Sequence, residues 1–162
     1  MRDVFTKDKE TQEALSAEFP EDIVPYAEKA GMRKDVLEWY WKAHWELPSP
    51  TQVYEMLHRL NPDVLRVRGD AYKEMGLDLA KLETTKETVE LYLKQADYDK
   101  RWRQRLLAIS YNPLTRVDLR RIYELGLIDD DDLLARLMEV GYTKKDAQLL
   151  LEFYKTFRQE EA

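Results

Sequence analysis

The sequence of 162 residues has no cysteine, only five glycines and no long apolar run. Without cysteine, a disulfide framework, a thiol nucleophile and a thiolate metal site are excluded. No apolar stretch approaches the roughly 20 residues that a membrane-spanning helix needs, so we expect no membrane partner. The chain opens with Met1-Arg2-Asp3-Val4-Phe5 and continues with charged residues, so we expect no secretory signal peptide.

Charged and apolar residues are both abundant in this chain. Charged residues make up 36%, and 26 Lys and Arg against 32 Asp and Glu give a net charge of −6. Apolar residues still reach 44%, with four Trp and ten Tyr, which is too much for a disordered chain. Asparagine is scarce while Glu, Lys and Arg are plentiful, a bias typical of heat-adapted proteins, so we expect a thermostable protein.

Apolar residues recur at helical spacing along almost the whole chain, so the sequence predicts an all-α fold. We expect about eight helices, near residues 21–30, 34–46, 50–60, 86–96, 99–110, 114–125, 130–139 and 144–159. A polar N-terminal arm is expected over 1–18 and a single helical-repeat domain over 19–162. Pro62, Gly69 and Gly76 predict a longer connecting insert near 61–83, with a loop and one or two short helices.

Residues typical of helix ends support these spans. Ser49 and Gln52, with Pro50 between them, predict a capping box at the start of the helix over 50–60. Similar starts are predicted by Thr84 with Glu87, by Thr143 with Asp146, and by Asn112 before Pro113. Helix stops are predicted at Gly31, Gly126 and Gly141, because glycine readily takes the left-handed conformation that follows many helices.

The helices also contain an internal repeat. A shift of 44 residues places 84–110 on 128–154, with Val89 on Leu133, and a shift of 66 places 19–45 on 85–111. Pro50-Thr51-Gln52-Val53 likewise resembles Leu114-Thr115-Arg116-Val117. A single helical hairpin cannot bury its apolar side alone, so the repeat predicts hairpins stacked into an array. A chance alignment of amphipathic helices is the alternative.

Three groups of residues within this pattern resemble a helical-repeat family found in virion-associated proteins of tailed phages and their uncultured relatives. They are Tyr40-Trp41-Lys42-Ala43-His44-Trp45-Glu46-Leu47-Pro48-Ser49-Pro50-Thr51-Gln52, then Ile109-Ser110-Tyr111-Asn112-Pro113-Leu114-Thr115-Arg116-Val117-Asp118, and Gly141-Tyr142 with Asp146-Ala147. The resemblance covers roughly residues 17–155. It implies an all-helical structural or assembly module, without catalytic residues, located in a virion or the host cytoplasm.

Candidate chemical sites are few. The run Asp129-Asp130-Asp131-Asp132 lacks the alternating spacing of a calcium loop and suits the first turn of a helix, where carboxylates interact favourably with the helix dipole. The two histidines, His44 and His58, lie on different predicted helices and do not form a zinc-binding pair. No glycine-rich phosphate loop and no nucleophile with its base are present. We therefore expect no metal, no cofactor and no enzymatic activity.

Two clusters are candidates for partner binding. Three tryptophans lie on more than one side of the predicted helix over 34–46, namely Trp39, Trp41 and Trp45. They are either core residues or a docking surface for a protein partner. The second cluster lies over 100–121, where seven basic residues and the single acid Asp118 give a net charge of +6 and leave −12 for the rest of the chain. It consists of Lys100, Arg101, Trp102, Arg103, Arg105, Arg116, Arg120 and Arg121.

The family resemblance and these clusters together lead to two predictions of function. The first is a structural or assembly protein of a phage or phage-like virion, which acts through contacts with other protein subunits and forms a homo-oligomer or a larger virion assembly. The second is a nucleic-acid-binding or packaging adaptor, because basic residues beside an aromatic one are typical of nucleic-acid contacts. In the first case the basic segment pairs with acidic surfaces of the same or another subunit.

Overall fold

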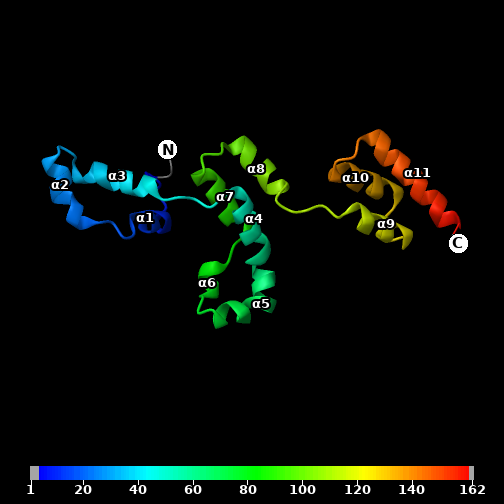
Figure 1. Ribbon diagram of the computed structural model, residues 1–162, viewed down its shortest axis with the longest axis horizontal. Coiled ribbons are helices and arrows are strands. Elements are labelled where there is room, and N and C mark those ends of the chain that lie inside the picture. The colour runs from blue at the N-terminus through cyan, green and yellow to red at the C-terminus, as the bar shows by residue number, and fades with distance from the viewer. Residues whose placement is uncertain (1–3, 161–162) are drawn as a thin grey trace. The chain divides into compact units, whose positions relative to one another are not determined.

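The computed structural model describes residues 4–160, with side chains up to residue 156, and this part of the chain is helical outside its turns (Figure 1). It contains eleven α-helices, a short 3-10 turn and no strand, which confirms the all-α prediction. The helices are α1 (Lys9–Ser16), α2 (Val24–Lys29), α3 (Lys34–His44), α4 (Pro50–Arg59), α5 (Pro62–Glu74), α6 (Leu79–Leu82), α7 (Lys86–Gln95), α8 (Lys100–Ala108), α9 (Arg116–Glu124), α10 (Asp130–Val140) and α11 (Lys144–Glu160); the 3-10 turn is η1 (Glu21–Ile23).

Each of the eight predicted spans contains a helix, and the described residues add α1, α5 and α6. The expected number of about eight is therefore too low. The extra helices lie in segments 1–18 and 61–83. The insert over 61–83 was expected to contain one or two short helices, and α5 and α6 occupy it. Residues 1–18 include only six apolar residues, so their helical periodicity is weak.

The chain forms two compact units, which divide after Ser110, where the sequence predicted one domain over 19–162. Each unit has its own cluster of buried apolar side chains. Residues 1–3 of the predicted arm and residues 161–162 of the predicted domain lie outside the described residues.

The C-terminal unit begins at Tyr111 and packs three helices together, with α10 against both α9 and α11 (Figure 1). Leu133 and Leu137 of α10 are fully buried at its centre. The buried cluster that surrounds them is Leu119, Tyr123, Ala147, Leu151 and Tyr154. Apolar burial of this kind contributes about 25 cal/mol per Å² and is the main stabilising term of the unit.

The N-terminal unit contains a similar packing of α4, α7 and α8. Helix α7 packs against both α4 and α8, and its Val89 and Leu93 are fully buried. The cluster is completed by Val53, Leu57 and Tyr92. The Tyr92 hydroxyl donates a hydrogen bond of 2.5 Å to the Pro48 carbonyl, which ties α7 to the segment before α4.

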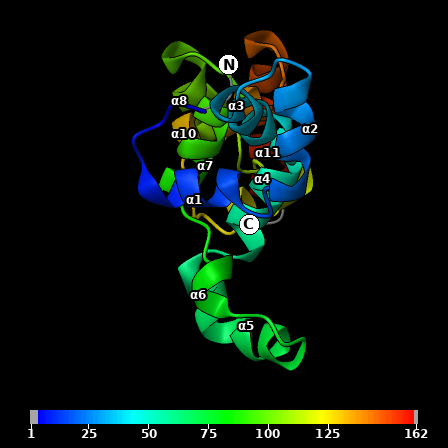
Figure 2. The same cartoon turned by 90° about the vertical axis from the view of Figure 1, so that its left-hand side faces the viewer.

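The predicted insert over 61–83 consists of helix α5, thirteen residues long, and the single-turn helix α6 beside it (Figure 2). Gly69 lets the two helices approach, because a Cβ built there lies 2.6 Å from Leu79 Cδ1. The amide of Thr84 donates a hydrogen bond of 2.9 Å to the Leu60 carbonyl. This bond joins the two ends of the insert directly.

The N-terminal segment is packed rather than extended as an arm. Helix α1 packs against α3, and Val4 and Thr11 are buried. The Gln12 side chain donates hydrogen bonds to the Val4 and Thr6 carbonyls at 2.9 and 2.8 Å. The Phe5 ring also meets Trp39 of α3 edge to face, so apolar contacts hold the segment in spite of its polar composition.

Several predicted helix ends are confirmed. Ser49 and Gln52 form the reciprocal capping box, and Thr143 accepts a hydrogen bond from the Asp146 amide at 3.2 Å. Gly31, Gly126 and Gly141 have positive φ angles at helix ends.

Two predicted starts are wrong. Thr85 with Thr88, not Thr84 with Glu87, begins α7, because the Thr84 amide and hydroxyl are bonded to the Leu60 and Leu82 carbonyls. Thr115, not Asn112, begins α9. Its hydroxyl accepts a hydrogen bond from the Asp118 amide and donates one to the Asp118 carboxylate.

We expect core truncations to act within one unit. Leu93→Ala and Leu137→Ala should each destabilise their own unit by about 3 kcal/mol, because each removes a fully buried side chain and leaves a cavity. Hydrogen exchange followed by mass spectrometry measures the loss of protection helix by helix. Equal loss of protection in both units from either substitution would contradict the division after Ser110.

Candidate functional site

The tryptophans of α3 hold the end of α1. The Trp41 and Trp45 indole nitrogens donate hydrogen bonds of 2.9 and 2.8 Å to the Ala17 and Leu15 carbonyls. These carbonyls lie at the C-terminal end of α1, where the helix has no partners of its own for them. The indole donors therefore stabilise the N-terminal helices against each other.

His44 lies between these two tryptophans. Its ring centroid is 4.2 Å from that of Trp41 and 4.5 Å from that of Trp45. Its Nδ1 atom makes a hydrogen bond with the Trp41 carbonyl. His44 therefore packs and hydrogen-bonds among the tryptophans of α3.

Trp39 occupies a different side of α3. Its side chain is 40% exposed, and its ring meets Phe5 edge to face at a centroid distance of 5.2 Å. Neighbouring Tyr40 is 65% exposed. Of the three predicted tryptophans, Trp39 is therefore the one whose ring offers the most open surface.

The basic residues of 100–121 belong to two different helices. Lys100, Arg101, Arg103 and Arg105 lie on α8 in the N-terminal unit, with Trp102 among them, whereas Arg116, Arg120 and Arg121 lie on α9 in the C-terminal unit. Each group is therefore described by itself.

Helix α8 packs Leu106 and Leu107 against the core of its unit and turns an outer face to solvent. We call this outer face the basic face; it is made of Arg101, Trp102, Arg105 and Ile109, which lie on one side of the helix, whereas exposed Lys100 lies on another side. The Arg105 guanidinium lies 5.2 Å from the Trp102 ring centroid, a cation–π geometry. Trp102 is 51% and Ile109 72% exposed, so the face combines positive charge with open apolar surface.

Asp99, immediately before α8, orders the start of the basic face. Its carboxylate caps the helix and accepts hydrogen bonds from the Arg101 amide and from the Arg101 guanidinium, both at 2.8 Å. The guanidinium hydrogen bond and then the amide bond lower the pKa of Asp99 below its ordinary value. On the other side of the helix, Arg103 is half-buried and turns away from the basic face.

The basic residues of α9 are exposed. Arg120 forms an ion pair of 3.0 Å with Glu124, one helical turn along. Arg116 and Arg121 are also exposed on this helix. Exposed ion pairs of this type contribute little to the free energy of unfolding. The main effect of these three arginines is therefore the positive charge on the surface of α9.

An acidic segment carries charge opposite to that of these basic helices, and it was not among the sites predicted from the sequence. Residues 10–28 contain six acids and no basic residue, and all six acids are exposed: Glu10, Glu13, Glu18, Glu21, Asp22 and Glu28. Glu21 is bound by the ammonium of Lys34 at 2.9 Å. The signal available in the sequence was the uninterrupted single sign of charge over these nineteen positions.

The acidic segment also carries exposed apolar side chains. Tyr26 is 74% and Ile23 39% exposed, and they lie between Asp22 and Glu28 in the chain. The first basic residue after the segment is Lys29, whose ammonium lies 6.0 Å from the Tyr26 ring centroid.

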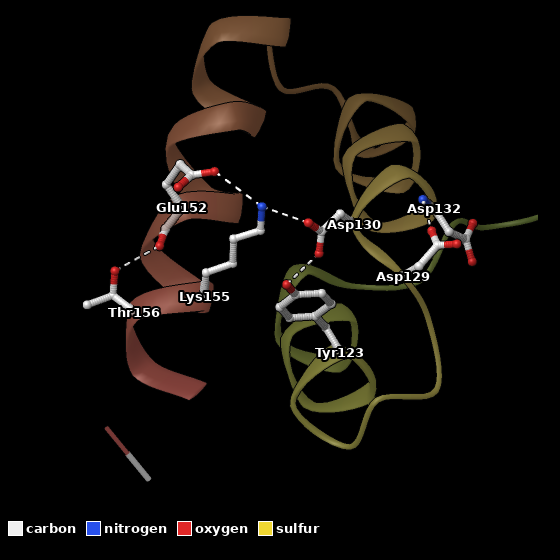
Figure 3. Close-up of polar contacts among 7 residues, drawn as sticks. All are labelled: Tyr123, Asp129, Asp130, Asp132, Glu152, Lys155 and Thr156. Atoms are coloured by element: carbon white, nitrogen blue, oxygen red, sulfur yellow. Dashed lines mark hydrogen bonds and ion pairs between the residues drawn. The ribbon is translucent and has the colours of Figure 1, made fainter. Parts of the chain in front are cut away.

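The run Asp129–Asp132 has two roles in the C-terminal unit. Asp129 caps α10 by accepting a hydrogen bond of 2.8 Å from the Asp132 amide, as the first-turn interpretation predicted. Asp130 joins all three helices, because it accepts a hydrogen bond of 2.7 Å from the Tyr123 hydroxyl and pairs with the Lys155 ammonium at 2.6 Å (Figure 3). The hydrogen bond to Asp130 raises the pKa of Lys155.

One concave surface lies between α4 and α5. A groove of about 550 Å³ is lined mainly by Met56, Leu60, Tyr72 and Met75. Its acid, Glu55, lies 3.8 Å from Arg59 across one turn of α4. Among the described residues, no group of three or more His, Asp or Glu side chains is placed to hold a metal ion.

No family model, no curated protein and no solved structure matches this chain. Among the described helices, none combines the length and the apolar character required to cross a membrane.

We expect Tyr123→Phe to destabilise the C-terminal unit by about 1 kcal/mol, because it removes the hydrogen bond to Asp130 from a side chain that is 2% exposed. Tyr154→Phe is the matched control. Tyr154 is equally buried, and its hydroxyl meets no hydrogen-bond partner among the described residues. Thermal unfolding of both variants measures the difference, and equal losses would contradict the role of Asp130.

The pKa of Asp99 tests whether the Arg101 guanidinium binds this carboxylate. Because the pKa is lowered in the folded state, the cap stabilises α8 above the ordinary value of 3.8 and is lost as the pH falls through the lowered pKa. Carboxyl chemical shifts measured by NMR should titrate below the ordinary value. In Arg101→Gln the Asp99 pKa should move back toward it, and an unchanged pKa would exclude the guanidinium as the cause.

Proposed function

We propose that this protein is a non-enzymatic structural or assembly protein, a virion component of a phage or phage-like particle that acts through protein–protein contacts. The observation that carries the proposal is the basic face of α8, where exposed Trp102 and Ile109 lie beside Arg101 and Arg105. Trp and Arg are the residue types most enriched among the energetically dominant positions of protein interfaces. The virion part of the proposal rests on the resemblance of residues 40–52 and 109–118 described above.

We also propose that the two units share one three-helix repeat, in which α4, α7 and α8 correspond to α9, α10 and α11. The shift of 44 residues places fully buried Val89 and Leu93 on fully buried Leu133 and Leu137. A shift of 66 places buried Val53 and Leu57 on Leu119 and Tyr123, and the cap Ser49 on the cap Thr115. This register differs by two residues from the shift of 64 that the match of Pro50–Val53 with Leu114–Val117 suggested. Helices α5 and α6 are then an insert in the first unit.

The two charged surfaces of this protein favour assembly of identical chains. One chain carries both an exposed acidic segment and an exposed basic face, so two copies offer complementary charge to each other. Symmetric homo-oligomers are the commonest assemblies of soluble proteins.

Nucleic-acid binding is the alternative function. It is favoured by the pairing of exposed Trp102 with Arg105, because nucleic-acid-binding surfaces combine stacking side chains with basic residues. The division of the seven basic residues between two units reduces its support. The attraction of phosphates grows with the number of basic residues that act together.

The proposed function is tested by the mass of the protein in solution. Sedimentation velocity over a range of concentrations should show species of at least twice the mass of one chain, because the exposed faces bind other subunits. A protein that stays strictly monomeric at the highest concentration would contradict the proposal.

A further inference from the structure

The acidic segment has the composition of a docking surface for a basic partner. Its exposed Tyr26 and Ile23 lie between the carboxylates of Asp22 and Glu28 in the chain. Helix α2, on which Tyr26 lies, packs against α3 and directly follows η1, whose Glu21 pairs with Lys34 of α3. The apolar and acidic groups are therefore presented on an ordered element.

The basic face of α8 has the complementary composition. Exposed Trp102 and Ile109 lie beside Arg101 and Arg105, and no acid occurs between Lys100 and Val117. Both surfaces thus combine large apolar side chains with an excess of one charge, and the two excesses are opposite in sign, although Asp99 pairs with Arg101 and Lys34 with Glu21.

The two surfaces do not cover each other within one chain. In the described part of the N-terminal unit, α8 packs only on α7, and α2 packs on α3 and η1. Both surfaces therefore remain available to another molecule.

We propose that the basic face of one copy docks on the acidic segment, around Ile23 and Tyr26, of a second copy. This inference rests on the proposed assembly function and names the surfaces through which it operates. The two surfaces differ, so each chain uses one for the preceding copy and one for the following copy. A head-to-tail contact of this kind produces rings if its rotation closes and filaments if it does not. Because both surfaces are charged, added salt weakens the contact.

The experiment reverses charge on one surface at a time and measures association by sedimentation velocity at low and high salt. Arg101→Glu with Arg105→Glu changes the basic face, and Asp22→Lys with Glu28→Lys changes the acidic segment. Either change should weaken self-association by at least about tenfold, since like charges then face each other. Arg66→Glu with Lys73→Glu, on exposed positions of α5, is the matched control and should associate as the natural sequence does.

Mixing the two reversed variants gives the sharpest result. Each retains the surface that the other has lost, and the two reversed surfaces are again opposite in charge, so the mixture should regain the association that neither variant shows alone. Arg105→Glu alone keeps the pair of Asp99 with Arg101 and separates an effect on docking from an effect on the start of α8. Circular dichroism checks that every variant is folded.

Three outcomes would overturn the inference. Oligomers that form equally well in both reversed variants would show that assembly uses other surfaces, and the proposed function would stand. A natural sequence that is monomeric at every concentration and salt would overturn the inference and the proposed function together. Normal self-association of the Arg101→Glu, Arg105→Glu variant, with loss of binding to labelled single-stranded DNA, would assign the basic face to nucleic acid.

Discussion

The apolar side of each helix is the constraint on which this fold depends. Most of the helices span about ten residues, too few to be stable in water through their own hydrogen bonds. Each helix must therefore bury its apolar side against another. Helices α4, α7 and α8 do so around Leu93, and α9, α10 and α11 around Leu137. The rest of the structure follows from that division: charged outer faces, tight turns between helices, and polar contacts at the helix ends.

Local sequence signals predicted the helices well because the chemistry that sets a helix end acts over a few residues. The capping box of Ser49 with Gln52 needs only its own residues, and Gly141 takes its positive φ angle whatever surrounds it. The predicted start of α7 was one residue too early, because the Thr84 amide donates its hydrogen bond to the Leu60 carbonyl, more than twenty positions earlier. A contact over that distance leaves no mark in a local pattern.

The candidate site was predicted only in part, because contacts between distant residues decide which of its side chains lie together. The basic residues of 100–121 could be chosen from the sequence alone, but their division between two units depends on packing that composition does not encode. The indole donors of Trp41 and Trp45 bind the carbonyls of Ala17 and Leu15, so these tryptophans serve the packing of the N-terminal helices. Asp130, one of four identical neighbours, differs from the others only because Tyr123 and Lys155 reach it.

The hydrogen bond between the Thr84 amide and the Leu60 carbonyl has a consequence for how this chain can be altered. Because the ends of the α5–α6 insert already meet, the free energy of closing that loop depends only weakly on its length. Residues 61–83 can therefore be shortened or exchanged for another sequence without pulling α4 away from α7. The insert is a natural place to attach a reporter group or an added domain, and a place where evolution can lengthen the protein without disturbing its core.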